Sequence, residues 1–252
     1  MAAMPVVPMP DPTPEPLSQG ARIIDTFIAP SKTFTDLRRS AAWWAPWLLM
    51  VIVGVAFAYV VDIKVGYPQV IENQISKSSL MQRQVEGLSP SERASQIQKR
   101  AVVTRVVYFA LPALSLIFVA IFAGIYHASF RFGANADLTY GRSFAVVVYA
   151  ALPEVLRGLL TIITLFAGVA PDSFNIQNPV ATNLGAFFDQ ATSPFLYAVG
   201  SSLDIFRLWS IALTAIGFAC AGKVKLGTAF AIVIGWFVFV TLVLSGLATL
   251  GS

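Results

Sequence analysis

The sequence contains very little of what most enzymes and soluble domains use. Of its 252 residues one is a cysteine, Cys220, which leaves no partner for an internal disulfide and too few thiols for a structural zinc site. A single histidine, His127, argues against most metal sites and catalytic triads. Charged residues make up only 12%, about half the share in soluble domains. With 56% hydrophobic residues and a mean hydropathy of +0.72, this is the composition of a membrane protein.

Five apolar blocks account for this composition, and each is close to or longer than the ~20 residues that cross a bilayer as a helix. Their residues do not alternate between apolar and polar, as they would in the strands of an outer-membrane barrel. The predicted crossings are residues 43–61, 106–129, 143–169, 195–221 and 226–250. The sequence therefore predicts an all-α, polytopic integral membrane protein whose membrane domain covers residues 43–250.

Two segments precede the first crossing. Residues 1–20 hold six prolines between Pro5 and Pro16, which favours a disordered tail, and no basic stretch there leads into an apolar one as in a cleaved signal peptide. In residues 21–42, Pro30 ends one short helical pattern and Ser31 is the expected cap of a second. Basic residues and clustered tryptophans are typical of the lipid headgroup layer. The predicted interfacial anchors are Phe27, Phe34, Arg38, Arg39, Trp43, Trp44 and Trp47. Residues 21–42 are therefore predicted to form an interfacial amphipathic helical region that lies on the membrane. A plain membrane-entry anchor without a binding partner explains this region equally well.

The charges of the loops predict the orientation. Basic residues gather on the side of the N-terminus, whereas residues 170–194 contain no lysine or arginine. The positive-inside rule then places the N-terminus in the cytoplasm and the C-terminus outside. This pattern also explains the net charge of +4 without any nucleic-acid binding.

The connection between the first two crossings disagrees with this orientation, since residues 62–105 carry seven basic residues. It has helical structure of its own. Residues 68–86 look helical and Gly87 fits their end. Ser89, Pro90 and Glu92 then form a capping box that begins a helix of about forty residues, continuous with the second crossing. We therefore expect a helical hairpin that stands off the membrane.

Four charged residues lie within the third and fourth crossings. Both crossings read acid-x-x-Arg, with Glu154 and Arg157 in one and Asp204 and Arg207 in the other. Charges at the bilayer centre are costly unless they are paired. If the two helices are antiparallel neighbours, Glu154 faces Arg207 and Arg157 faces Asp204. This neutral cluster is either a clamp that fixes helix pairing, the interpretation favoured by its balanced charge, or a proton, ion or anion site.

Other features are less specific. Pro112 and Pro153 are predicted to kink the second and third crossings. The loop at residues 172–179 is either a lid over the charged cluster or a plain connector. The sequence has no phosphate-binding loop, zinc-protease motif or nucleophile elbow. We therefore predict no catalytic residue, no metal, no cofactor and no enzymatic activity.

Several short motifs resemble the Yip (Yip-one) domain family. They are residues 24–34, which read IDTFIAPSKTF, residues 149–153 (YAALP), residues 203–206 (LDIF) leading to Trp209, and residues 215–218 (AIGF). The resemblance covers the chain from residue 21 and is closest to bacterial members, which implies a bacterial cytoplasmic membrane. It implies five crossings and a cytoplasmic N-terminus. Eukaryotic members engage Rab-type GTPases and one another, so GTPase binding is implied here only by analogy.

The sequence leads to two hypotheses for function. The first is a non-enzymatic membrane organiser that contacts the lipid bilayer and binds other membrane proteins or a second copy of itself. The alternative is a carrier of a small solute or ion that uses Glu154, Arg157, Asp204 and Arg207. Neutralising one acid would abolish transport by a carrier without unfolding it.

Overall fold

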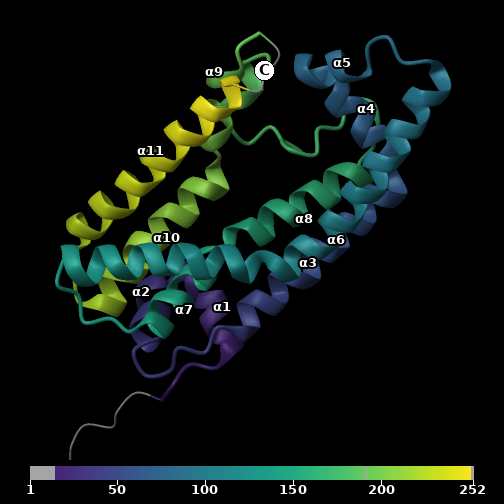
Figure 1. The fold of residues 1–252 in the computed structure, drawn as a ribbon. Helices are drawn as coiled ribbons and strands as arrows, with labels where there is room; N and C mark the ends of the chain where they lie inside the picture. Colours follow the sequence, from purple (N-terminus) through teal and green to yellow (C-terminus); the bar gives the residue numbers. More distant parts are fainter. Residues whose placement is uncertain (1–14, 191, 251–252) are drawn as a thin grey trace, which may run out of the picture.

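The computed structural model describes residues 15–190 and 192–250, so most of the proline-rich tail predicted for residues 1–20 lies outside the described residues. Within that part every regular element is a helix. In chain order these are α1 (Gln19–Ile28), α2 (Pro30–Asp36), α3 (Trp44–Lys64), α4 (Tyr67–Lys77), α5 (Ser79–Val85), α6 (Pro90–Ala128), the π-helical turn η1 (Ser129–Gly133), α7 (Tyr140–Ala150), α8 (Pro153–Phe166), the 3-10 turn η2 (Leu184–Phe187), α9 (Pro194–Ser202), α10 (Ile205–Gly222) and α11 (Leu226–Leu250). Figure 1 shows their arrangement.

Five described stretches are long and apolar enough to cross a membrane. They are Trp44–Lys64, Pro90–Gly133, Tyr140–Phe166, Ile205–Gly222 and Leu226–Leu247. The predicted class, an all-α membrane protein with five crossings, is confirmed. The fourth crossing was predicted wrongly as one helix over residues 195–221. The chain leaves the helical conformation at Leu203 and Asp204, so α9 and α10 are separate helices.

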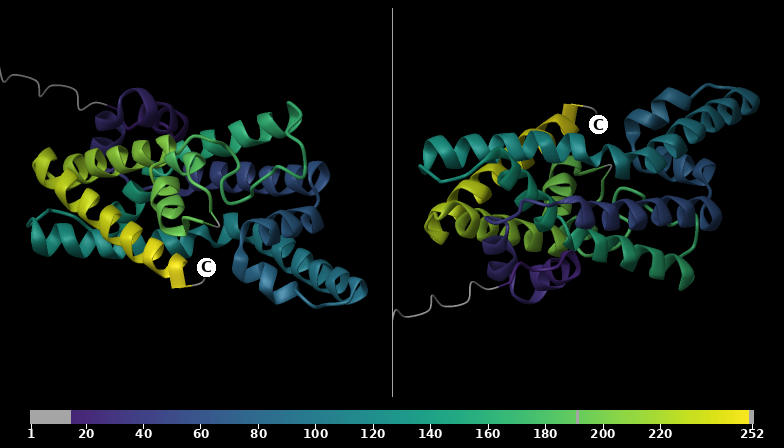
Figure 2. Two further views of the ribbon diagram at one scale, coloured as in Figure 1. Left: turned by 90° about the horizontal axis from the view of Figure 1, so that it is seen from above. Right: turned by 90° about the horizontal axis from the view of Figure 1, so that it is seen from below.

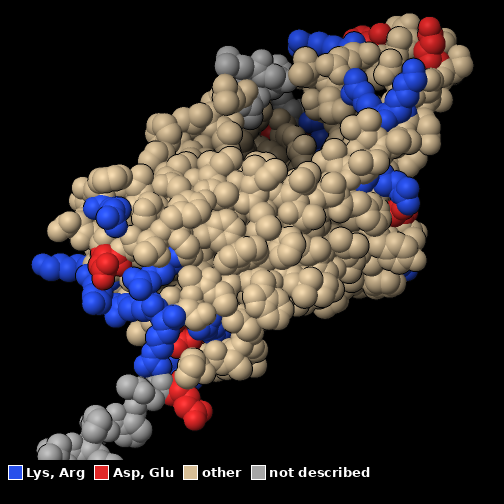
Figure 3. Space-filling view, turned by 60° about the horizontal axis from the view of Figure 1, so that its bottom comes forward, with Lys and Arg blue, Asp and Glu red and all other residues tan. Residues whose placement is uncertain are grey.

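The helices form two groups that meet at one end. α3 packs against both α6 and α8, while α10 packs against α7 and α11. In Figure 1 the pair α10–α11 diverges from α8 towards the top, and Figure 2 shows α4 and α5 at the opposite end of the molecule from the start of α11. Charged side chains gather at these two ends, with an almost uncharged band between them (Figure 3). This band is the surface expected to face lipid.

The end near α2, η1 and the start of α11 carries six basic residues outside the helix interiors, which we call the basic end. They are Arg38, Arg39, Arg131, Arg142, Lys223 and Lys225. The other end, which we call the hairpin end, is formed by α4, α5 and the first part of α6. The loop of residues 170–190 lies at this hairpin end and folds back onto α9 through η2.

The capping box that begins α6 is confirmed. The Ser89 hydroxyl accepts a hydrogen bond from the backbone N–H of Glu92 at 3.4 Å, and a Glu92 carboxylate oxygen accepts one from the backbone N–H of Ser89 at 2.9 Å. The helix then continues for 39 residues into the second crossing, as predicted. The segment before it is two helices rather than one, because Ser78 leaves the helix and caps α5.

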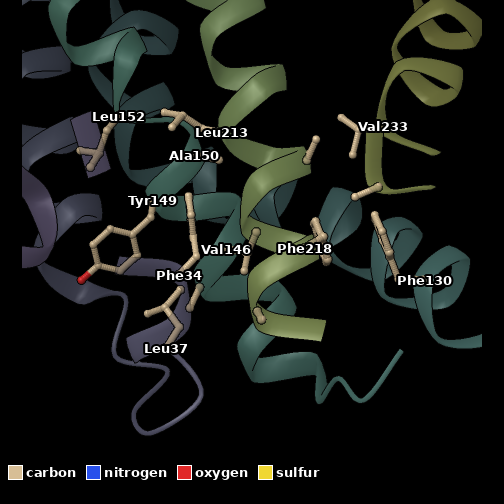
Figure 4. Close-up of a cluster of buried hydrophobic side chains, with 14 of the residues drawn as sticks. Phe34, Leu37, Phe130, Val146, Tyr149, Ala150, Leu152, Leu213, Phe218 and Val233 are labelled. Carbon is tan, nitrogen blue, oxygen red and sulfur yellow. The ribbon is translucent and has the colours of Figure 1, made fainter. Parts of the chain in front are cut away.

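The N-terminal region is a helical hairpin packed on the bundle, where the sequence predicted a region lying on the lipid. α2 lies against α10, and Phe34 is completely buried, so its prediction as an interfacial anchor is wrong. Figure 4 shows Phe34 and Leu37 beside Val146 of α7. Gly217 of α10 makes this approach possible, since a Cβ there would lie 3.0 Å from the Phe34 ring. The predicted Ser31 cap is also wrong, because α2 begins at Pro30 without a side-chain cap.

A buried ion pair joins the two helices of this hairpin. Arg22 of α1 donates from Nε to Asp36 of α2 at 2.8 Å, and a terminal nitrogen of Arg22 lies 2.7 Å from the same carboxylate oxygen. The Arg22 side chain is 2% exposed and that of Asp36 is 9% exposed. The Arg22 backbone carbonyl also accepts hydrogen bonds from Thr26 and Thr33. The hairpin is therefore held by a polar core of its own as well as by its apolar contact with α10.

Candidate functional site

The third crossing changes direction before its charged residues. α7 ends at Ala150 and α8 begins at Pro153, which occupies the first helical turn, where its missing N–H costs nothing. Glu154 and Arg157 follow on the same face of α8. The Arg157 Nε donates to a carboxylate oxygen of Glu154 at 2.6 Å, three residues apart. The acid-x-x-Arg spacing is therefore satisfied inside one helix, as i,i+3 pairs on a helix surface are.

The acid of the fourth crossing has a different role. Asp204 lies at the break between α9 and α10, is 6% exposed, and caps α10 by accepting hydrogen bonds from the backbone N–H groups of Phe206 at 2.9 Å and Arg207 at 3.3 Å. Its other carboxylate oxygen accepts a hydrogen bond from the Thr182 hydroxyl. The Ile205 N–H donates to the Thr182 carbonyl at 3.2 Å. Asp204 therefore ties the loop at the hairpin end to the start of α10.

The expected cross-helix pairs are not formed among the described residues. Glu154 pairs with Arg157 and not with Arg207, and Asp204 accepts from backbone and from Thr182 and not from Arg157. Arg207 is exposed in the first turn of α10. Arg207 lies fifteen residues, about 22 Å of helix, from Gly222 at the other end of this crossing. It is therefore close to the opposite lipid surface, which its long side chain can reach. The break at Leu203 caused the difference, because it turns an intramembrane acid into a helix cap.

A cavity of about 440 Å³ lies beside the ion pair of α8. Its walls come from α3, α6, α8 and the loop at the hairpin end. The lining residues include Val53, Gly54 and Phe57 of α3, Tyr108, Pro112 and Ser115 of α6, Glu154, Arg157, Gly158 and Thr161 of α8, and Ile176, Gln177 and Pro179 of the loop. α6 stays helical through Pro112, whose ring lies where a Cβ on Gly54 would clash at 2.6 Å. Glu154 and Arg157, two residues of the predicted charge cluster, thus line the same cavity as Pro112, one of the two predicted kink prolines.

The loop that covers this cavity is held at several points. The Asn73 side chain of α4 donates to the carbonyls of Pro171 at 2.7 Å and Phe174 at 2.9 Å. Further along, Gly185 of η2 and Gly200 of α9 meet so closely that a Cβ on Gly200 would lie 2.8 Å from the Gly185 nitrogen. The loop is a fixed part of the fold rather than a detached connector.

The predicted anchors at the basic end contact protein as well as the surface. Trp43 packs edge-on against Phe144 with ring centroids 5.0 Å apart, and Phe27 packs against Trp209 at 5.5 Å. Arg38 donates to the Cys220 carbonyl, and Arg142 donates to the Arg38 carbonyl at 3.1 Å. Of the remaining predicted anchors, Trp47 packs on Trp43 and Trp44 is 55% exposed. Arg39 also interacts with another group of the protein.

Several functional contacts were not anticipated from the sequence. The Arg22–Asp36 pair and the hydrogen bonds from Asn73 to the loop carbonyls join residues far apart in the chain. No short sequence motif could therefore have predicted them. Asp204 did carry a local signal, because an aspartate after Ser201 and Ser202 and before an apolar run is a typical N-cap. For metals, no group of three or more histidine, cysteine, aspartate or glutamate residues comes together within residues 15–190 and 192–250.

The fold and site together define a class, a polytopic all-α integral membrane protein with a docked N-terminal hairpin and charged residues inside its membrane domain. The family model of the Yip1 domain matches residues 24–248, which is nearly the whole chain. The chain belongs to the Yip1 domain family. Comparison with curated proteins and with solved structures gave no match. The family match confirms the resemblance found in the sequence and does not distinguish bacterial from other members.

Proposed function

We propose that this protein is a non-enzymatic membrane organiser that binds another membrane protein, or a second copy of itself, through its N-terminal hairpin. The observation that supports this most directly is the outward face of α1. Ile24 and Ile28, one helical turn apart, are 61% and 74% exposed, although the same helix is fixed to α2 by the buried Arg22–Asp36 pair and α2 packs on α10. A rigidly held, exposed apolar ridge is a typical docking surface.

The capture of partners from native membranes in mild detergent tests this proposal. We expect Ile24→Ser with Ile28→Ser to abolish capture of the partners that the unchanged protein retains, because the apolar ridge is lost while the fold is kept. The matched control, Ile24→Leu with Ile28→Leu, keeps the ridge apolar and should retain the partners. Point changes are preferable to removing residues 1–40, since that deletion also removes the buried Phe34. If the serine variant captures the same partners as the unchanged protein, the proposal is wrong.

The identity of the partner is open to the same experiment. A GTPase among the proteins lost from the serine variant would extend the family analogy to this chain. The family match gives no support to the solute-carrier hypothesis.

We further propose that the basic end faces the cytoplasm, and that the membrane is a bacterial cytoplasmic one. The basic residues of this end support it, while the seven basic residues of residues 62–105 oppose it. Labelling of single introduced cysteines, in a protein whose Cys220 is replaced by alanine, tests this orientation. We expect a membrane-impermeant maleimide to label Glu86→Cys at the hairpin end in intact cells, and Gly133→Cys at the basic end only after lysis. The reverse labelling pattern would invert the orientation.

A further inference from the structure

The ion pair of α8 faces the cavity with part of its hydrogen-bonding capacity unused. The side chains of Glu154 and Arg157 are 35% and 38% exposed although they lie within a membrane-crossing segment. Their one contact joins Arg157 Nε to Glu154 Oε2. Within the described residues no hydrogen bond reaches the other Glu154 oxygen or leaves the two terminal nitrogens of Arg157. A carboxylate acceptor and four N–H donors are therefore available to a ligand.

The remaining walls of the cavity are mainly apolar, with a few polar groups. Val53, Phe57 and Pro112 supply apolar surface. The Ser115 and Thr161 hydroxyls are already used, since each donates to a carbonyl of its own helix. A volume of about 440 Å³ falls within the ~300–1,000 Å³ typical of sites for small molecules, which combine apolar walls with a few convergent polar groups.

The depth of the pair restricts the charge of a ligand. Glu154 lies near the middle of the span Tyr140–Phe166, where an uncompensated charge is expensive. The pair itself is neutral, so a ligand with a net charge would leave that charge unbalanced in the apolar core. A ligand that carries one positive and one negative group keeps the site neutral and satisfies both partners at once.

We propose that this cavity binds an amphipathic zwitterion, a molecule with a primary ammonium group and an acidic group beside an apolar body. The ammonium group hydrogen-bonds to the free oxygen of Glu154, the acidic group is held by the terminal nitrogens of Arg157, and the apolar body lies against α3 and α6. Two sources share this chemistry: an aminophospholipid headgroup, and a free amino acid with an apolar side chain.

Binding by the purified full-length chain in detergent tests the proposal, with native mass spectrometry as the readout. The probes are phosphatidylethanolamine, the anionic phosphatidylglycerol of the same acyl chains, and free leucine. We expect phosphatidylethanolamine or leucine to bind at least tenfold more tightly than phosphatidylglycerol. Binding of the lipid alone identifies the lipid source, and binding of leucine identifies the small-molecule source. Equal binding of both lipids without leucine binding, or no binding of any probe, would overturn the proposal.

Charge variants make the test specific to the site. Glu154→Gln leaves Arg157 uncompensated, so we expect the preference to reverse towards phosphatidylglycerol. Ser115→Leu fills the cavity and keeps both charges, so we expect it to weaken zwitterion binding more than tenfold. Arg207→Gln removes the exposed arginine of the fourth crossing, which does not line the cavity, and is the matched control. Thermal unfolding shows which variants are folded, and folded Glu154→Gln and Ser115→Leu proteins that bind like the unchanged chain would contradict the assignment.

Discussion

Replacing Arg22 by alanine is expected to loosen α1 from α2 within the N-terminal hairpin and to lower the free energy of unfolding by about 3–5 kcal/mol. The reason is the burial of its partner. Asp36 is 9% exposed and accepts both contacts from Arg22, so the substitution leaves a carboxylate buried without its cation. Chemical unfolding in detergent measures the loss, and faster trypsin cleavage at Arg38 and Arg39 reports loosening of the hairpin.

Two control variants separate burial from charge. Lys32 pairs with Asp25 at 2.8 Å but is 59% exposed, so Lys32→Ala should cost about 1 kcal/mol or less. Replacing both buried partners, Arg22→Met with Asp36→Leu, should recover most of the stability, because no unpaired charge remains. A loss below about 1 kcal/mol for Arg22→Ala would show that the pair does not hold the hairpin.

Asp204→Ala is expected to have the second largest effect, a loss of about 2–4 kcal/mol that combines a lost helix cap with an unsatisfied loop contact. Asp204 is 6% exposed, so water is a poor substitute for the carboxylate that caps these two backbone N–H groups. Hydrogen exchange at residues 205–208 should accelerate, which locates the damage at the start of α10. Unfolding in detergent gives the total.

The partners of Asp204 supply the controls. Asp204→Asn keeps an oxygen acceptor for the cap, so it should cost less than half as much. Thr182→Val removes only the hydroxyl that donates to Asp204 and should cost about 1 kcal/mol. An alanine variant as stable as the asparagine variant would mean that the break between α9 and α10 is held by other contacts.

Much of the fold followed from local chemistry. The long apolar runs predicted five crossings, because each must satisfy its own backbone as a helix in lipid. The capping box at Ser89 and Glu92 predicted the start of α6, since its bonds join residues three apart. The same local logic explains the Glu154–Arg157 pair, whose i,i+3 spacing was visible in the sequence although a cross-helix pair was expected.

The differences arose wherever an apolar or charged pattern had two possible environments. The sequence pattern around Phe34 is compatible with a lipid-facing anchor and with a residue of the protein core. Phe34 lies in the core because Gly217, on a helix far away in the chain, leaves room for its ring. Asp204 fits both an intramembrane ion pair and a helix cap. The contact with Thr182, brought by a folded-back loop, accompanies the second role.

The sequence by itself determined the class of this protein, its five crossings and the identity of its charged residues, because hydrophobic run length, caps and spacing act within a few residues. Only the tertiary structure decided which charges meet, where the fourth crossing breaks and that a cavity lies beside Glu154 and Arg157. Those features depend on how closely helices far apart in the chain can approach. That approach is set by side-chain volume at positions such as Gly54, Gly200 and Gly217, and local sequence does not encode the partner that each one meets.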